Sequence, residues 1–145
     1  MNQRQFVTSS QEETEALGRR LGSNLTAPMI ILLEGSLGAG KTALTRGIVD
    51  GFGCTDPTLV HSPTFSLINE YHCQTATVYH IDLYRLETLR DLYSIGLDEL
   101  VTSNAIIIIE WAEKLLFKVD HTWRIRLEVT GPDTRAITIE EKVEG

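Results

Sequence analysis

A glycine-rich stretch followed by a lysine and a threonine carries the clearest chemistry in this sequence. Residues 35–42 are Gly-Ser-Leu-Gly-Ala-Gly-Lys-Thr, which fits the phosphate-binding pattern G-x-x-x-x-G-K-T. Glycines let successive backbone N–H groups surround an anion, and the start of a following helix favours negative charge. Lys41 would contact the β- and γ-phosphates, and the Thr42 hydroxyl would bind Mg²⁺. We predict phosphate binding by Ser36, Leu37, Gly38, Ala39, Gly40, Lys41 and Thr42.

Two acidic residues are candidates for the magnesium side of such a site. Glu110 follows the apolar run 106–109 and therefore falls at the C-terminal end of an expected buried strand, where a Walker B acid lies. Asp82 lies in the run "YHIDLY", where a carboxylate is costly to bury unless it is paired or bound to a cation. From local sequence alone, Glu110 could also be a surface residue, and Asp82 could pair with Arg85 or a backbone N–H.

Other candidates are weaker. The segment "VHSPTF" (60–65) contains Thr64 and follows the expected loop helix, where nucleotide-sensing switch segments lie, but most such segments only connect. Trp111 could be a core residue or a contact surface. The histidines share no metal-ligand spacing, and single histidines are more often structural or exposed than catalytic: His61, His72, His80 and His121.

The elements needed to position these residues alternate between helix and strand. Ser10 and Glu13 have capping-box spacing before leucines at helical intervals, which predicts an N-terminal helix. The runs 29–33 and 105–111 predict buried strands, and 42–52 predicts a helix directly after the glycine loop. Residues 64–72 and 76–84 predict a hairpin, with short helices ending near Gly96 and at "GLDELV". Alternation on both sides of "GPDT" predicts an antiparallel C-terminal hairpin.

Together these elements predict one α/β domain over residues 1–145. The expected fold is a P-loop NTPase domain with a mostly parallel central sheet flanked by helices and an antiparallel C-terminal hairpin. The length of 145 residues and the 42% hydrophobic content suit one domain with a sizeable core.

Composition also bears on partners and location. A formal charge of −7 argues against a protein that grips nucleic acid over its whole surface, so contact with RNA is expected to be local or through a partner. The N-terminus lacks the apolar region of a signal peptide, and no run reaches the ~18 apolar residues of a membrane span. Cys54 and Cys73 have no zinc-site spacing. We expect a cytoplasmic protein without membrane contact, in which both cysteines are reduced thiols.

The expected nucleotide is ATP, because the Asn-Lys-x-Asp motif that reads guanine is missing from the sequence. A small-molecule kinase is the alternative, although the arginines are scattered rather than gathered in a lid. A scaffold that binds ATP without hydrolysing it also remains open. No arginine is an obvious arginine finger, that is, a side chain that would stabilise the charge of the transition state. We therefore expect slow basal hydrolysis and a partner that completes the site.

Five segments, in this order and spacing, resemble the TsaE (YjeE) family of bacterial ATPases: "GSLGAGKT", "HSPTF", "YHIDLYRL", "GLDEL" and "IIIEWAEK". The resemblance covers roughly residues 10–140. It implies an ATPase of tRNA threonylcarbamoyladenosine (t6A) formation that binds the TsaB–TsaD heterodimer, with ATP turnover allowing repeated transfer by TsaD. Contact with tRNA would occur only through this complex.

The resemblance also assigns roles to individual residues. It implies a phosphate loop over Ser36 to Thr42, a magnesium-linked Glu110, an important Asp82, and a switch-like Thr64 near the γ-phosphate. Trp111 matches the aromatic neighbour of the family's glutamate. The family usually has Asp where this chain has Ser36. Backbone contacts to phosphate should survive that difference, whereas a polar contact made by the aspartate would be lost.

Overall fold

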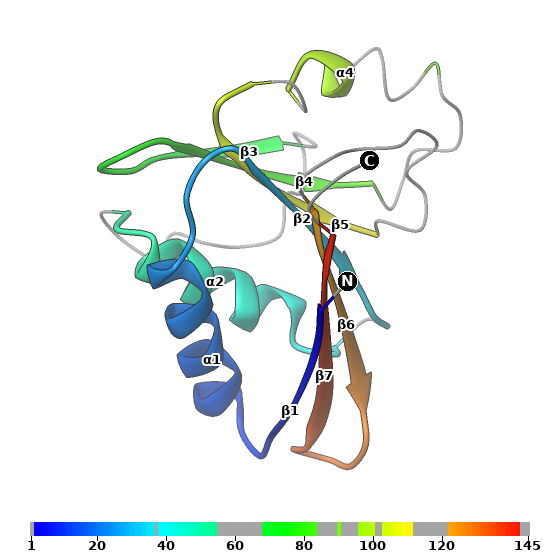
Figure 1. Ribbon diagram of the computed structural model, residues 1–145. Helices are drawn as coiled ribbons and strands as arrows, with labels where there is room; N and C mark the ends of the chain where they lie inside the picture. The colour runs from blue at the N-terminus through cyan, green and yellow to red at the C-terminus, as the bar shows by residue number, and fades with distance from the viewer. Residues whose placement is uncertain are drawn as a thin grey trace.

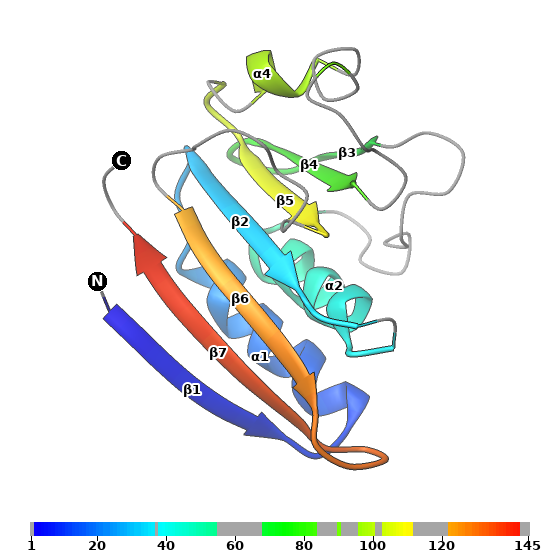
Figure 2. The same cartoon turned by 90° about the vertical axis from the view of Figure 1, so that its right-hand side faces the viewer.

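The structure is a computed structural model that describes residues 2–36, 38–54, 68–83, 90, 96–100, 103–111 and 122–142. Its centre is a seven-stranded sheet in the order β1-β7-β6-β2-β5-β4-β3 (Figures 1 and 2). The strands are β1 (Asn2–Thr8), β2 (Met29–Glu34), β3 (Ile68–His72), β4 (Thr77–Asp82), β5 (Ile106–Glu110), β6 (Thr122–Val129) and β7 (Arg135–Lys142). The helices in the described residues are α1 (Gln11–Ser23), α2 (Lys41–Gly51) and α4 (Leu97–Leu100).

The sheet is mixed, so the prediction of a mostly parallel sheet is wrong. The pairs β6–β2, β2–β5 and β5–β4 are parallel, whereas β3–β4, β6–β7 and β1–β7 are antiparallel. Short connections join β3 to β4 and β6 to β7, and such hairpins impose antiparallel pairing. The two predicted hairpins are confirmed, and the parallel strands occupy the middle of the sheet.

Apolar side chains cover both faces of the central strands. All of β5, from Ile106 to Glu110, is buried, as the continuous apolar run predicts. α1 and α2 lie side by side over one face, behind the sheet in Figure 2. Leu100 of α4 packs with Ile107 and Ile109 in a second apolar cluster, distinct from the cluster formed with α1 and α2. Among the described helices, none has the length and apolarity to cross a membrane.

The N-terminal helix begins as predicted. The Ser10 hydroxyl accepts a hydrogen bond from the Glu13 amide at 3.1 Å, and the Glu13 carboxylate accepts one from the Ser9 amide at 2.7 Å. These bonds satisfy backbone donors that a helix start leaves open. β1 was not predicted, because its polar sequence "NQRQFVT" lacks apolar alternation; it is held as an edge strand on β7.

Glycines allow α1 and α2 to pack backbone to backbone. A Cβ added at Gly47 would lie 2.0 Å from the Glu15 carbonyl oxygen, and one at Gly18 would lie 2.4 Å from the Leu44 carbonyl oxygen. Real Cβ atoms do not approach backbone so closely, so these positions need glycine for space. The contact fixes the start of α1 next to the start of α2.

The cysteines correct another prediction. Cys54 and Cys73 form a disulfide, with Cα atoms 4.2 Å apart, rather than two reduced thiols. Their residues also form a single antiparallel bridge between the end of α2 and the β3–β4 hairpin. Sequence separation concealed this pairing, because the hairpin folds back beside the helix.

Some predictions fall outside the described residues. The hairpin strands begin at Ile68 and Thr77, and residues 64–67 are not described. The same holds for most of the helix expected before Gly96, for Leu37 and for Thr64. The helical turn expected at "GLDELV" is confirmed by α4.

Candidate functional site

The glycine loop connects the end of β2 to the start of α2, in the strand–loop–helix order predicted from the sequence. Gly38 and Gly40 adopt φ values of 79° and 102°, which L side chains rarely adopt. Gly40 is the N-cap of α2 and has no side chain to accept hydrogen bonds from the first-turn amides. The helix start can therefore offer these amides and its positive dipole end to an anion.

Lys41, the first residue of α2, is only 6% exposed although its side chain is charged. Its ammonium donates to the Gly35 carbonyl oxygen at 2.7 Å and lies 4.0 Å from the centre of the Trp111 ring. An ammonium has three donors, and the Gly35 bond uses one. The carbonyl and the aromatic face partly offset the cost of burying the charge, and a phosphate oxygen would offset more of it.

Salt bridges hold the strand end that precedes the loop. The Glu34 carboxylate accepts hydrogen bonds from Arg124 and, at 3.1 Å, from Arg126 on β6. The hydrogen bond and the charge of Glu34 raise the pKa of Arg126 above its ordinary value. These contacts tie β2 to β6 just before Gly35 and so limit where the loop can start.

Asp82 and Glu110 end two neighbouring parallel strands in the same register. Side chains alternate along a strand, so Asp82 and Glu110 point to the same face as Val78 and Ile108, which lie in the apolar cluster with α2. Neighbouring strands are about 4.8 Å apart. The two carboxylates are therefore neighbours, and a cation that both contact would relieve their repulsion.

His80 binds Glu110 from the same face of β4. Its Nε2 lies 2.5 Å from Oε2 of Glu110, and the exposed fractions of the two residues are 0% and 3%. The spacing of the histidines in the sequence gives no reason to expect a role for His80. The available signal was its position two residues before Asp82, which places both side chains on one face of a strand.

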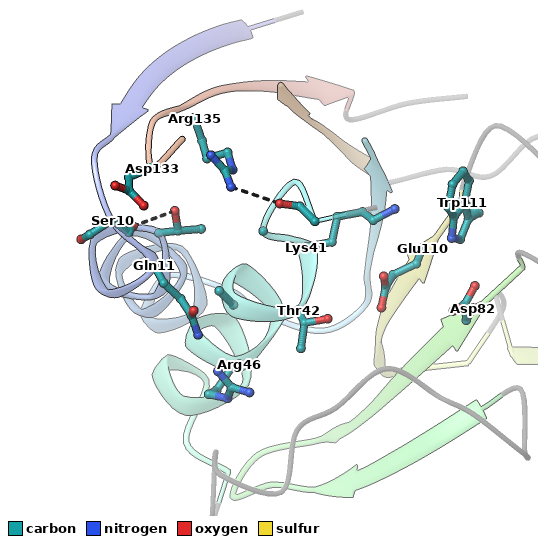
Figure 3. Close-up of a pocket in the computed structure, with 14 residues that line it drawn as sticks. Ser10, Gln11, Lys41, Thr42, Arg46, Asp82, Glu110, Trp111, Asp133 and Arg135 are labelled. Atoms are coloured by element: carbon teal, nitrogen blue, oxygen red, sulfur yellow. Dashed lines mark hydrogen bonds between the residues drawn. The ribbon is translucent and has the colours of Figure 1, made fainter. Parts of the chain in front are cut away.

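A cavity of about 470 Å³ lies where the glycine loop meets the ends of β4 and β5 (Figure 3). One side is lined by residues of the glycine loop and the strand ends: Lys41, Thr42, Glu110, Asp82 and Trp111. The other side comes from the start of α1 and from the β6–β7 hairpin: Ser10, Gln11, Thr14, Asp133 and Arg135. This second side is not evident in the sequence, because neither segment carries a phosphate- or metal-binding motif.

Arg135 connects the hairpin to the glycine loop. Its guanidinium donates to the Gly38 carbonyl oxygen at 3.1 Å and to the Thr134 carbonyl oxygen at 2.9 Å. The bond to Gly38, drawn dashed in Figure 3, ties this carbonyl group of the glycine loop to the β6–β7 hairpin. Arg46 also lines the cavity and lies 3.7 Å from the Glu15 carboxylate. Both arginines are thus already engaged with groups of this chain.

The donor set fits Mg²⁺. The Thr42 hydroxyl and the carboxylates of Asp82 and Glu110 are hard oxygen donors that line one cavity. Within the described residues there is no cluster of three or more His, Cys, Asp or Glu side chains that could hold a metal alone. That is compatible with Mg²⁺, which keeps several waters and is usually bound by one or two carboxylates together with substrate phosphates.

The structure thus brings together most of the residues predicted from the sequence. Gly38, Gly40, Lys41, Thr42, Asp82 and Glu110 line the cavity. Ala39, within the loop, is fully buried, and Ser36 lines a second, more open hollow with Trp111 and Arg126. Leu37, Thr64 and Arg85 lie outside the described residues, so their predicted roles stay predictions.

The chain is similar to proteins of one known family. The family model "Threonylcarbamoyl adenosine biosynthesis protein TsaE" matches residues 8–137. A tRNA threonylcarbamoyladenosine biosynthesis protein TsaE from Treponema pallidum is 35% identical over 92% of this chain and 97% of its own length. One from Rickettsia felis is 41% identical over 74% of this chain, and the match spans 62% of the Rickettsia protein.

Similarity extends to a solved structure. The crystal structure of YdiB from Bacillus subtilis superposes with a TM-score of 0.77 at 30% identity, covering 98% of this chain and 86% of that one. The family match begins at the end of β1 and ends within β7, so it includes the glycine loop, both acidic strand ends and the hairpin that bounds the cavity. This chain therefore belongs to the TsaE family.

Proposed function

We propose that this chain is a Mg²⁺-dependent ATPase that supports t6A formation in tRNA by binding a TsaB–TsaD pair. The observation that carries this proposal is the convergence of Lys41, Thr42, Asp82 and Glu110 on one cavity at the start of a glycine-capped helix. The role in t6A formation rests on membership of the TsaE family and on the names of the relatives.

The geometry suggests how ATP would lie. Its β- and γ-phosphates would meet the amides at the start of α2 and the Lys41 ammonium, since these are the cationic and donor groups of the loop side. The nucleoside would then extend toward the second side of the cavity, where Gln11 and Asp133 offer polar groups.

Thr42, Glu110 and Asp82 would hold Mg²⁺, which offsets negative charge on the phosphates. The fixed loop amides and Lys41 stabilise charge that develops on the transferred phosphoryl group. Because Arg46 and Arg135 already contact groups of this chain, neither is poised as a finger, and we propose that the partner pair stimulates a slow basal rate. The chain would act in the cytoplasm and reach tRNA only through the complex.

The test is ATP hydrolysis by the purified chain, alone and with a matched TsaB–TsaD pair. The Glu110→Ala variant controls for contaminating ATPases, and Glu128→Ala, at an exposed position of β6, is the matched control for removing a glutamate. Stimulation by the pair that is lost in Glu110→Ala supports the proposal. A fast rate without the pair contradicts stimulation by the partner. An undiminished rate in Glu110→Ala contradicts the assignment of Glu110 to the site of ATP hydrolysis.

The same assay separates the alternatives. ADP release that requires an added small-molecule acceptor would indicate a kinase. Tight ATP binding without hydrolysis, with or without the pair, would indicate a nucleotide-dependent scaffold.

A further inference from the structure

His80 is a polar side chain at the centre of an apolar layer. It is fully buried on β4, its strand neighbour Ile108 on β5 is also fully buried, and Val78 lies on the same face of β4. A valine or isoleucine would suit this position in a buried strand, so the imidazole needs an explanation beyond packing.

The hydrogen bonds of His80 point to one partner. Nε2 bonds to Glu110 at 2.5 Å, whereas Nδ1 is buried and has no partner among the described residues. A histidine that served only to satisfy a buried network would be expected to use both nitrogens. The imidazole is therefore placed for the Glu110 contact at the expense of its other nitrogen.

The contact with His80 holds one of the two carboxylate oxygens of Glu110, Oε2. A carboxylate that binds Mg²⁺ is ionised and can only accept a hydrogen bond, so in that state Nε2 carries the proton and donates to Oε2. His80 lies two residues before Asp82 on β4 and does not line the cavity. It therefore contacts Glu110 from the buried side of this carboxylate, away from the cavity. The second oxygen, Oε1, is not used by this bond.

We propose that His80 is a positioning residue that orients Glu110 for Mg²⁺, an inference that rests on the proposed function. By holding Oε2, His80 selects one side-chain conformation of Glu110 and leaves Oε1 for the ion or a water bound to it. Partners that orient a ligating carboxylate commonly change metal affinity by about 10- to 100-fold when they are removed. His80 makes no contact with ATP in this account.

The variant that tests this role is His80→Phe, which keeps a flat ring and removes the donor. His80→Gln should retain most of the function, because its amide N–H can occupy a place close to that of Nε2–H. Val78→Ala, on the same face of the same buried strand, is the control for general disturbance of β4.

Two quantities should be measured by calorimetry: ATP affinity in EDTA, and the Mg²⁺ concentration that gives half of the Mg²⁺-dependent gain in ATP affinity. We expect His80→Phe to raise this Mg²⁺ concentration about 10- to 100-fold and to leave ATP affinity in EDTA within about 2-fold. His80→Gln should recover most of the loss, and Val78→Ala should resemble the unmutated chain. A merely structural role would change both quantities, or neither.

The outcomes separate this inference from the proposed function. If the unmutated chain shows the Mg²⁺ effect and His80→Phe retains it in full, the positioning role is overturned and the ATPase proposal stands. If the unmutated chain binds ATP without any Mg²⁺ effect, both are overturned.

A spectroscopic test needs no change at His80. Imidazole ¹⁵N spectra of the unmutated chain should show His80 protonated at Nε2 and bare at Nδ1, and Glu110→Ala should shift the Nε2 signal. A His80 protonated at Nδ1 instead, or a signal indifferent to Glu110→Ala, would overturn the inference even if His80→Phe failed to fold.

Discussion

Asp82 and Glu110 are register partners at the ends of the parallel strands β4 and β5, and both line the cavity beside Lys41 and Thr42. The repulsion between two adjacent carboxylates is relieved when a cation joins them. In this account the pair acts as a single unit that binds one Mg²⁺.

This pairing predicts non-additive effects in a double-mutant cycle. Asp82→Asn and Glu110→Gln should each weaken Mg²⁺-dependent ATP binding, and the double variant should lose little more than the worse single variant, because both act on one ion. Calorimetric titrations with Mg²⁺ present would measure this. Losses that simply add would show that the two carboxylates act independently.

Lys41 should matter for ATP affinity and not for folding. Lys41→Met keeps the length of the side chain and removes its charge, so ATP binding should weaken by about 10- to 100-fold, as for a lost charged hydrogen bond. Because Lys41 is a largely buried residue, removing its charge should leave the melting temperature unchanged or higher. Arg20→Met, on the exposed face of α1, is the control and should bind ATP normally. Unchanged ATP affinity in Lys41→Met would contradict the phosphate role.

The close packing of α1 on α2 predicts an unusual response to alanine. In an open helix, Gly→Ala stabilises by up to ~1 kcal/mol, but at Gly47 the new Cβ would meet the Glu15 carbonyl oxygen at 2.0 Å. Gly47→Ala should therefore lower the free energy of unfolding by about 1–3 kcal/mol, as overpacked positions do. Urea unfolding would measure it, with Ser23→Ala at the exposed end of α1 expected within about 0.5 kcal/mol of the unmutated chain. A Gly47→Ala variant as stable as the unmutated chain would mean that the helices can move apart at no cost.

The Cys54–Cys73 disulfide predicts a dependence on reductant. It joins residues 19 apart in sequence, and cross-links of that size commonly stabilise by about 3 kcal/mol. Thiol alkylation of the denatured, unreduced protein should label neither cysteine, and reductant should lower the urea midpoint. The variant with serine at both positions should not respond to reductant. Two labelled thiols in the unreduced protein would show that the bond does not form.

The sequence was most informative where local pattern and chemistry coincide. The glycine loop, the buried β5 ending in Glu110, and both hairpins follow from short-range signals. What it concealed depends on contacts between distant segments. β1 is polar and stable only as an edge strand on β7, and the disulfide joins a helix end to a hairpin.

The same reason applies to the site. Lys41, Thr42, Asp82 and Glu110 carry recognisable patterns, and the structure brings them to one cavity. Arg135 contacts the loop through the Gly38 carbonyl oxygen, and His80 contacts Glu110, although neither residue belongs to a motif with a metal-ligand or phosphate spacing. Such supporting residues are set by sheet order and register, which local sequence does not specify.

The most direct test of the central claim is the amount of t6A formed in tRNA by a matched TsaB–TsaD pair, counted per TsaD molecule. With the unmutated chain and Mg²⁺·ATP, we predict many t6A products per TsaD, and with Lys41→Met we predict that formation stops near one. Equal yields with the unmutated chain and with Lys41→Met would contradict the claim that ATP turnover in this cavity supports repeated t6A formation.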